Sequence, residues 1–231
     1  MLRHRLLDAI LRRLARHPDA DGFVLRGGVR VRQLVPGTRR AARDLDLVCL
    51  LPYDRAAVCR TVTELLAAEL PGEPWFDVGA IRLDDDWRPV APGLRLVVDG
   101  TVGGVTAPVA VDLRVHLPLG PPTDRVDGVR ALRPESIAAR QLRVLTDLGR
   151  GGWRPKDLAD LAALAPILEP TSLGAAIDAV FADGRADPRE VFGRPAWWSG
   201  RAAAARWADA GGDTLDAVVG RVRAAFAPVL G

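Results

Sequence analysis

Two aspartates one residue apart, Asp44 and Asp46, lie inside the apolar run DLDLVCLLP. Side chains two positions apart on a β-strand project from the same face, so both carboxylates can reach one hard cation. Two unpaired carboxylates on one buried face would be strongly destabilised by desolvation and mutual repulsion. The spacing therefore predicts that something positive lies at this face.

A third acid, Asp112, stands in a second apolar strand, VAVDLRVH, where Arg114 and His116 share its face by the same period of two. Three carboxylates on adjacent strands are suited to bind Mg²⁺, with substrate phosphates completing the coordination shell. Such a set predicts a site for metal-assisted phosphoryl or nucleotidyl transfer.

The alternative for the first two aspartates is a solvated rim on an edge strand, paired with Arg40 and Arg43. A glycine pair, Gly27 and Gly28, favours the catalytic interpretation because it follows a predicted strand and precedes a predicted helix. Backbone N–H groups and a helix N-terminus can hold a triphosphate there, with no side chain in its way.

The elements that must position these residues alternate between helix and strand in the first 70 residues. Apolar residues at helical spacing predict an amphipathic helix that ends at His17 and Pro18. A strand, a short helix and the strand of the first two aspartates follow, and Asp54 caps a further helix that stops at Pro71. Three valine-rich strands are then predicted, at 76–85, 93–102 and 107–119.

From Pro134 onward the pattern becomes helical and rich in alanine, with predicted helices at 134–149, 154–168, 171–183 and 213–230. The segment GPPTDRVDGVRALRP is interpreted as a linker. The sequence therefore predicts an α+β fold: a core of small mixed sheet and packed helices at 1–125, followed by a helical domain at 126–231. Trp197, Trp198 and Trp207 are expected to pack between the C-terminal helices.

Composition limits the class of protein. With 231 residues and 48% apolar content, the chain can fill a core. It has no apolar run near the roughly 18 residues of a membrane span, and charges interrupt its N-terminal segment, so a cytoplasmic protein is expected. Two cysteines, Cys49 and Cys59, indicate neither a disulfide framework nor a zinc cluster. Residues 1–60 hold thirteen arginines against six acidic residues, which suits an anionic partner.

The glycine pair and the aspartates carry a family resemblance. LRGG followed by RDLDL resembles the signature of the DNA polymerase β-like nucleotidyltransferase superfamily. The later stretch PESIAARQLRVLTDLGRGGWRPKDLADLAAL is similar to the segment that distinguishes the AbiEii/AbiGii, or MenT-like, type IV toxin nucleotidyltransferases. The resemblance runs from about Phe23 to Leu164. It implies a small mixed-sheet nucleotidyltransferase core and a helical C-terminal domain, a nucleoside triphosphate donor with Mg²⁺, a tRNA or other acceptor, and a cognate antitoxin.

The resemblance also implies roles for individual residues. Gly27 and Gly28 would hold the triphosphate. Asp44, Asp46 and Asp112 would bind the metal, with Asp112 also a candidate general base. The element around Lys156, the only lysine of the chain, would bring Lys156 and Asp157 to the nucleotide, with Asp160 completing the motif.

Three positions depart from the family pattern or leave two interpretations open. Gln141 stands where the family's helix usually presents a lysine to the phosphates, and an amide cannot replace that charge. Val29 stands where serine or threonine is frequent. Arg30, expected at an exposed position after the glycine turn, is either a nucleotide contact or an ordinary surface arginine.

Three functions follow from these residues. The first is a Mg²⁺-dependent nucleotidyltransferase toxin that moves a nucleoside monophosphate to an RNA or protein hydroxyl, with the arginine-rich loop PGTRRAAR guiding a polyanion such as tRNA. The second is a small-molecule enzyme of the aminoglycoside- or lincosamide-modifying kind, which shares the layout of glycines and aspartates. The third, suggested by Gln141, is a degenerate member that binds nucleotide without turnover.

Overall fold

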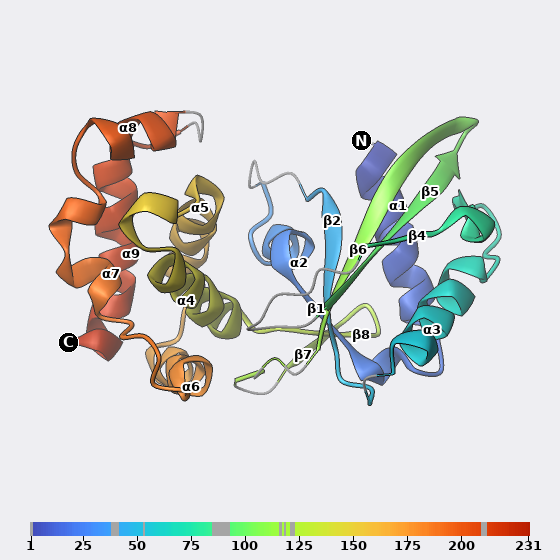
Figure 1. The fold of residues 1–231 in the computed structure, drawn as a ribbon, viewed down its shortest axis with the longest axis horizontal. Coiled ribbons are helices and arrows are strands. Elements are labelled where there is room, and N and C mark those ends of the chain that lie inside the picture. Colours follow the sequence, from blue (N-terminus) through green and yellow to red (C-terminus); the bar gives the residue numbers. More distant parts are fainter. Residues whose placement is uncertain are drawn as a thin grey trace. The chain divides into compact units, whose positions relative to one another are not determined.

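The computed structural model describes residues 2–37, 42–52, 54–84, 93–115, 117, 119–120, 123–208 and 212–231 (Figure 1). The chain divides into two compact units. Unit 1 comprises Met1–Arg32, Ala41–Leu117 and Thr123–Leu132, and unit 2 comprises Gln33–Arg40, Pro118–Pro122 and Arg133–Gly231. The longest segment of unit 2 thus begins at Arg133, and the domain boundary predicted near residue 125 stays a prediction.

In the part of the chain that the structure describes, unit 1 is built on a mixed sheet of eight strands. The strands are β1 (Phe23–Arg26), β2 (Asp44–Cys49), β3 (Trp75–Phe76), β4 (Arg82–Asp84), β5 (Gly93–Val102), β6 (Val105–Val115), β7 (Asp124–Val126) and β8 (Val129–Ala131). Their order across the sheet is β3-β5-β6-β2-β1-β8-β7, and β4 also pairs with β5. The β1–β8 and β2–β6 pairs are parallel, whereas the other pairs are antiparallel.

One face of this sheet carries the core of unit 1. Leu45, Leu47 and Cys49 alternate with the polar positions of β2 and are buried in this core. The helices α1 (Leu2–Leu14) and α3 (Arg55–Ala67) lie on this side, and α2 (Gly27–Leu34) lies on the other (Figure 1). Because strand side chains alternate between faces, the aspartates at positions 44 and 46 are left on the side of α2.

Two segments of unit 1 differ from the sequence-based prediction. The expected strand at 76–85 is divided into β3 and β4 by a 3₁₀ turn at Val78–Ala80. The expected linker contains the hairpin of β7 and β8, joined by Asp127 and Gly128 with φ of 50° and 84°. Positive φ at both loop residues is the type I′ pattern that an Asp-Gly pair favours, so a recognisable hairpin signal was missed.

Unit 2 is helical. Its helices are α4 (Pro134–Gly152), α5 (Pro155–Leu164), α6 (Pro170–Phe181), α7 (Glu190–Gly193), α8 (Arg201–Ala208) and α9 (Leu215–Leu230). The tryptophans at 197, 198 and 207 are buried in its core, as expected, and the Trp153 and Trp198 rings lie 5.3 Å apart. Aromatic packing thus holds the C-terminal helices together.

Within the described ranges, every helix is too short or too polar to traverse a lipid bilayer.

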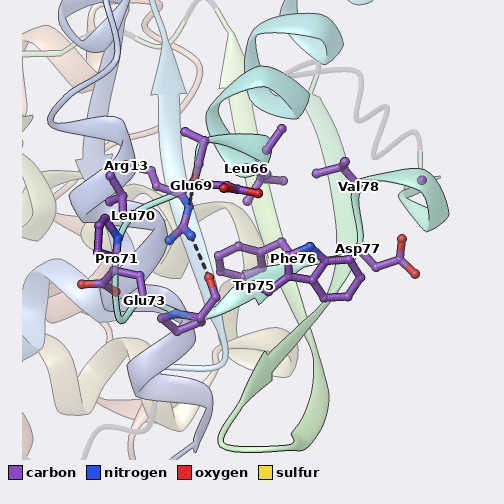
Figure 2. Close-up of a pocket in the computed structure, with 14 residues that line it drawn as sticks. Arg13, Leu66, Glu69, Leu70, Pro71, Glu73, Trp75, Phe76, Asp77 and Val78 are labelled. Atoms are coloured by element: carbon purple, nitrogen blue, oxygen red, sulfur yellow. Dashed lines mark hydrogen bonds between the residues drawn. The ribbon is translucent and has the colours of Figure 1, made fainter.

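A buried arginine ties α1 to the segment before β3 (Figure 2). The Arg13 guanidinium donates to the carbonyl oxygens of Ala68 at 2.8 Å, Pro74 at 2.7 Å and Ala9 at 3.3 Å, and it lies over the Phe76 ring. Burial lowers its pKa, although each of its three nitrogens donates a hydrogen bond. The same arginine lines an open pocket of about 580 Å³ between Leu66 and Gly79, which contains none of the aspartates discussed above.

We expect Arg13→Met to lower the free energy of unfolding by about 2–4 kcal/mol, because three carbonyl oxygens lose their donor in a buried setting. Arg12 supplies the matched control. Its guanidinium is half exposed and pairs with Glu73 at 2.6 Å, so Arg12→Met should cost about 1 kcal/mol or less. Urea unfolding of the two variants measures the difference, and equal losses would contradict the assignment of Arg13 as the anchor of this segment.

Candidate active site

Four charged side chains form a row across four neighbouring strands. The register pairs Arg26 of β1 with Asp46 of β2, Asp46 with Asp112 of β6, and Asp112 with Arg95 of β5. Two carboxylates therefore lie side by side with a guanidinium at either end. We call these four residues the charged row.

Asp44 adds a third carboxylate beside the row. It precedes Asp46 by two positions on β2 and so projects from the same face. Its Oδ2 lies 3.7 Å from Nη1 of Arg95. The structure therefore brings the three predicted acids to one face of the sheet.

The guanidinium groups at the ends of the row make different contacts. Nη1 of Arg95 donates to both carboxylate oxygens of Asp112, at 2.8 and 2.7 Å. Nη2 of Arg26 donates to Oδ1 of Asp46 at 3.3 Å. The positive partners of the aspartates thus come from neighbouring strands. Of the two partners considered in the solvated-rim interpretation, Arg43 is exposed and Arg40 lies outside the described residues. His116 and residues 38–41 of the arginine-rich loop also lie outside them.

Asp112 has an unusual acidity for a carboxylic acid. Burial raises its pKa to about 6, Arg95 opposes this shift, and the negative charges of Asp46 and Asp44 add to it. The group is therefore ionised at neutral pH but close to the point at which it takes up a proton. A carboxylate in this range can serve as a general base.

The donor set fits a hard divalent cation, since all of its ligands are carboxylate oxygens on one face. The pKa of Asp112 stays above its ordinary value even with Arg95 beside it, which indicates that a further positive charge would stabilise the carboxylates. Among the described residues, no three acidic, histidine or cysteine side chains are arranged as a ready-made metal cluster. The carboxylates of the row are instead directed toward the two arginines.

Gly27 begins α2 directly beside Asp46. Its φ is +67°, and a Cβ at this position would lie 2.5 Å from Cγ of Asp46 and closer still to Oδ2. Only glycine satisfies both constraints, which explains the first glycine of the predicted turn. Gly28 follows in the first turn of the helix and is buried. The helix N-terminus, with its free N–H groups, thus adjoins the carboxylates.

Arg30 is buried and not exposed as expected. Its Nε donates to the carbonyl oxygen of Leu132 at 2.9 Å, and its Nη2 pairs with Asp124 at 2.7 Å. Desolvation lowers its pKa in this setting, and Asp124 partly offsets that shift. These contacts join α2 to the β7–β8 hairpin, so the geometry gives Arg30 a structural role and does not support the predicted nucleotide contact.

The remaining predicted nucleotide contacts, Lys156 and Asp157, lie in the first turn of α5 in unit 2. Lys156 is exposed, whereas Asp157 is buried and accepts a hydrogen bond from Nε of Arg154 at 2.5 Å. A carboxylate in the first turn of a helix also complements the helix dipole. These contacts give Asp157 a structural role within unit 2. Its contact with nucleotide stays a prediction.

Gln141, which stands where the family usually has a lysine, is bound to Asp160, the second acid of the motif around Lys156. Its Nε2 donates to Oδ2 of Asp160 at 3.0 Å, while its Oε1 is buried without a hydrogen-bond partner among the described residues. Arg143, two positions after Gln141 on α4, pairs with Asp147 and Asp183. The neutral amide of Gln141 is therefore hydrogen-bonded to buried Asp160, whereas a lysine at position 141 would form an ion pair with it.

Sequence reasoning missed Arg26 and Arg95 as members of the site. A signal was present for each, since Arg26 ends the apolar strand FVLR and Arg95 interrupts the apolar strand GLRLVV. Arginine is so common in this chain that the signal did not stand out.

The comparisons with known proteins agree with this architecture. The sequence profile of the family described as "Nucleotidyl transferase AbiEii toxin, Type IV TA system" matches residues 9–214. None of the curated proteins compared with the chain matches its sequence.

Two solved structures share the fold. A nucleotidyltransferase structure from H. pylori is 15% identical with a TM-score of 0.57, and the alignment covers 99% of this chain and 93% of that one. The structure of JHP933 from Helicobacter pylori is also 15% identical, with a TM-score of 0.55 and coverage of 99% and 90%. Their likeness concerns the fold, because the identity is low.

We expect Gly27→Ala to destabilise unit 1 by more than its backbone strain alone, since the new methyl group would displace the Asp46 carboxylate. Gly37→Ala is the matched control, because Gly37 has φ of +85° and a methyl group there would meet no described atom within 4 Å. The control should cost about 1–2 kcal/mol, and Gly27→Ala about 1–3 kcal/mol more. Urea unfolding measures both, and equal costs would show that Asp46 is not crowded against the turn.

The acidity of Asp112 predicts a pH-dependent stability in metal-free buffer. Its folded pKa of about 6 is above the ordinary value of 3.8, so the folded state binds the proton more tightly. Stability from this group is therefore greatest at low pH and falls as pH rises from about 4 to about 6. Relative to Asp112→Asn, the wild type should lose about 2 kcal/mol between pH 4.5 and 7.5. Urea unfolding of both proteins at these two pH values tests it, and a constant difference would contradict it.

Proposed function

Since this chain belongs to the AbiEii nucleotidyl transferase toxin family of type IV toxin–antitoxin systems, we propose that it transfers a nucleoside monophosphate from a nucleoside triphosphate to a hydroxyl group of RNA. Membership makes the chain a nucleotidyltransferase. The donor base, the acceptor and the dependence on Mg²⁺ belong to the proposal, as does an antitoxin partner.

The observation that carries the proposal is the meeting of three carboxylates with the start of α2. Asp46 lies against Gly27, and its register partner Asp112 lies on the adjacent strand. Acids and free N–H groups at one place suit a triphosphate with its counter-ion, because the amides take phosphate oxygens and the acids take the cation.

In the proposed reaction, the N-terminus of α2 binds the β- and γ-phosphates, and Gly27 allows them a close approach. Asp44, Asp46 and Asp112 would hold Mg²⁺, which when bound neutralises phosphate charge and orients the α-phosphate for attack. Asp112 accepts the proton of the acceptor hydroxyl as the hydroxyl oxygen forms its bond to the α-phosphorus. The bond from the α-phosphorus to the bridging oxygen breaks, and pyrophosphate leaves with that electron pair.

An RNA acceptor is supported by charge. The chain has a pI near 9.5, and the first sixty residues carry an excess of arginine over acidic residues. Phosphate backbones are bound chiefly through such cations. We retain Lys156 as a proposed phosphate contact, because it is exposed and its ammonium can meet a phosphate oxygen. Arg30 is withdrawn from the proposed contacts because its donors are used inside unit 1.

The test is transfer of label from each α-labelled nucleoside triphosphate to total tRNA in the presence of Mg²⁺. The wild type should label RNA, and Asp46→Asn should reduce the rate by at least about a hundredfold, since it removes a charge that acts in the transition state. Asp99→Asn is the control: Asp99 is a half-exposed acid of β5 that pairs with Arg82, so its rate should match the wild type.

Other outcomes point elsewhere. Label found on an aminoglycoside or lincosamide and not on RNA would replace the RNA acceptor by a small molecule. Nucleotide binding without transfer to any acceptor would contradict catalysis and would implicate Gln141, whose amide lacks the charge of the usual lysine.

A further inference from the structure

We propose that Arg95 is a resident counter-ion that occupies the cation's place among the carboxylates and must release them before a divalent ion can bind. The inference rests on the proposed function for the identity of the ion. It concerns the regulation of that site by a residue of the chain itself.

The contacts of Arg95 resemble those of a bridging cation. A single nitrogen, Nη1, lies 2.8 and 2.7 Å from the two oxygens of Asp112 and 3.7 Å from Oδ2 of Asp44. These two acids belong to different strands, β6 and β2. One positive group thus contacts two of the three acids proposed to bind the ion.

The opposite end of the row shows that such bridging is not a general result of the register. Arg26 occupies the equivalent end position, yet among the described residues its ion pair is with Asp46 alone, at 3.3 Å. The difference follows from position, since Arg95 approaches from the side of Asp112 and reaches across to the second acid. Arg95 is therefore the arginine whose guanidinium conflicts with an ion bound by both carboxylates.

Arg95 is also able to leave. Its side chain is 38% exposed, whereas the structural Arg30 is 5% exposed and bonded to a backbone carbonyl. A long side chain at the surface can change rotamer without disturbing the core. Once displaced, its guanidinium can pair with phosphate oxygens, which suit its planar donors as well as carboxylates do.

Exchange of this kind links the ion to the nucleotide. A divalent ion alone must compete with a guanidinium for Asp44 and Asp112 and therefore binds weakly. An ion that arrives with a triphosphate brings acceptors for the displaced arginine. Arg95 thus favours loading of the ion together with its nucleotide over loading of the ion alone.

The experiment measures Mn²⁺ affinity by isothermal titration of the full chain without nucleotide. Arg95→Met keeps the length of the side chain and removes its charge, so Mn²⁺ should bind about tenfold more tightly than to the wild type. Arg95→Lys keeps the charge and should stay near the wild type. Arg82→Met is the control, since Arg82 pairs with Asp99 on the same sheet at 3.8 Å, and it should leave Mn²⁺ affinity unchanged.

Unchanged or weaker Mn²⁺ binding to Arg95→Met would overturn the inference, as would equal tightening by Arg82→Met. Thermal unfolding with and without Mn²⁺ provides a second measurement, in which the ion should raise the melting temperature of Arg95→Met more than that of the wild type. If Arg95→Met does not fold, Arg95→Gln supplies the same comparison. Tighter Mn²⁺ binding without nucleotide transfer would retain this inference and reject the proposed function, whereas transfer with unchanged Mn²⁺ binding would do the reverse.

Discussion

The register between β2 and β6 is the constraint on which the site depends. Parallel pairing sets Asp46 opposite Asp112, and the outer strands then place Arg26 and Arg95 at the two ends of the row. Two partly buried carboxylates side by side destabilise the fold through desolvation and mutual repulsion, and neighbouring guanidinium groups reduce this cost in free energy. A slip of one residue would move the acids to the opposite face, into the apolar core under α1 and α3. The fold and the site are thus fixed by the same pairing.

Stability and chemistry oppose one another along this row. Its members are held near the surface by strands whose other face is a packed core, so the carboxylates keep their positions although they repel one another. The pKa of Asp112 is raised chiefly by burial and further by the negative charges of Asp46 and Asp44, and Arg95 offsets only part of this shift. Gly27 adds a second constraint, because α2 can begin so close to Asp46 only without a side chain. Both features are unfavourable for folding and useful for binding a charged substrate.

Local patterns in the sequence predicted much of this structure, whereas long-range pairing escaped them. Alternation along β2 placed Asp44 and Asp46 on one face, and the cap at Asp54 is confirmed by hydrogen bonds from Ala56 and Ala57. Register between strands depends on tertiary contacts, so Arg95 could not be assigned to Asp112 from spacing. The burial of Arg30 likewise depends on partners about a hundred residues away in the chain. The β7–β8 hairpin was predictable from Asp127 and Gly128, but the surrounding prolines and polar residues resembled a linker.

The single lysine of the sequence makes site-selective labelling of a side-chain amine feasible. Lys156 is exposed in the first turn of α5, and every other positive side chain apart from histidine is an arginine, which amine acylation does not modify. Amine-selective reagents would therefore attach a fluorophore to a single side chain, that of Lys156 in unit 2, besides any terminal α-amine, with no need to replace Cys49 or Cys59. The charged row of unit 1 contains no amine and would pass through such labelling intact.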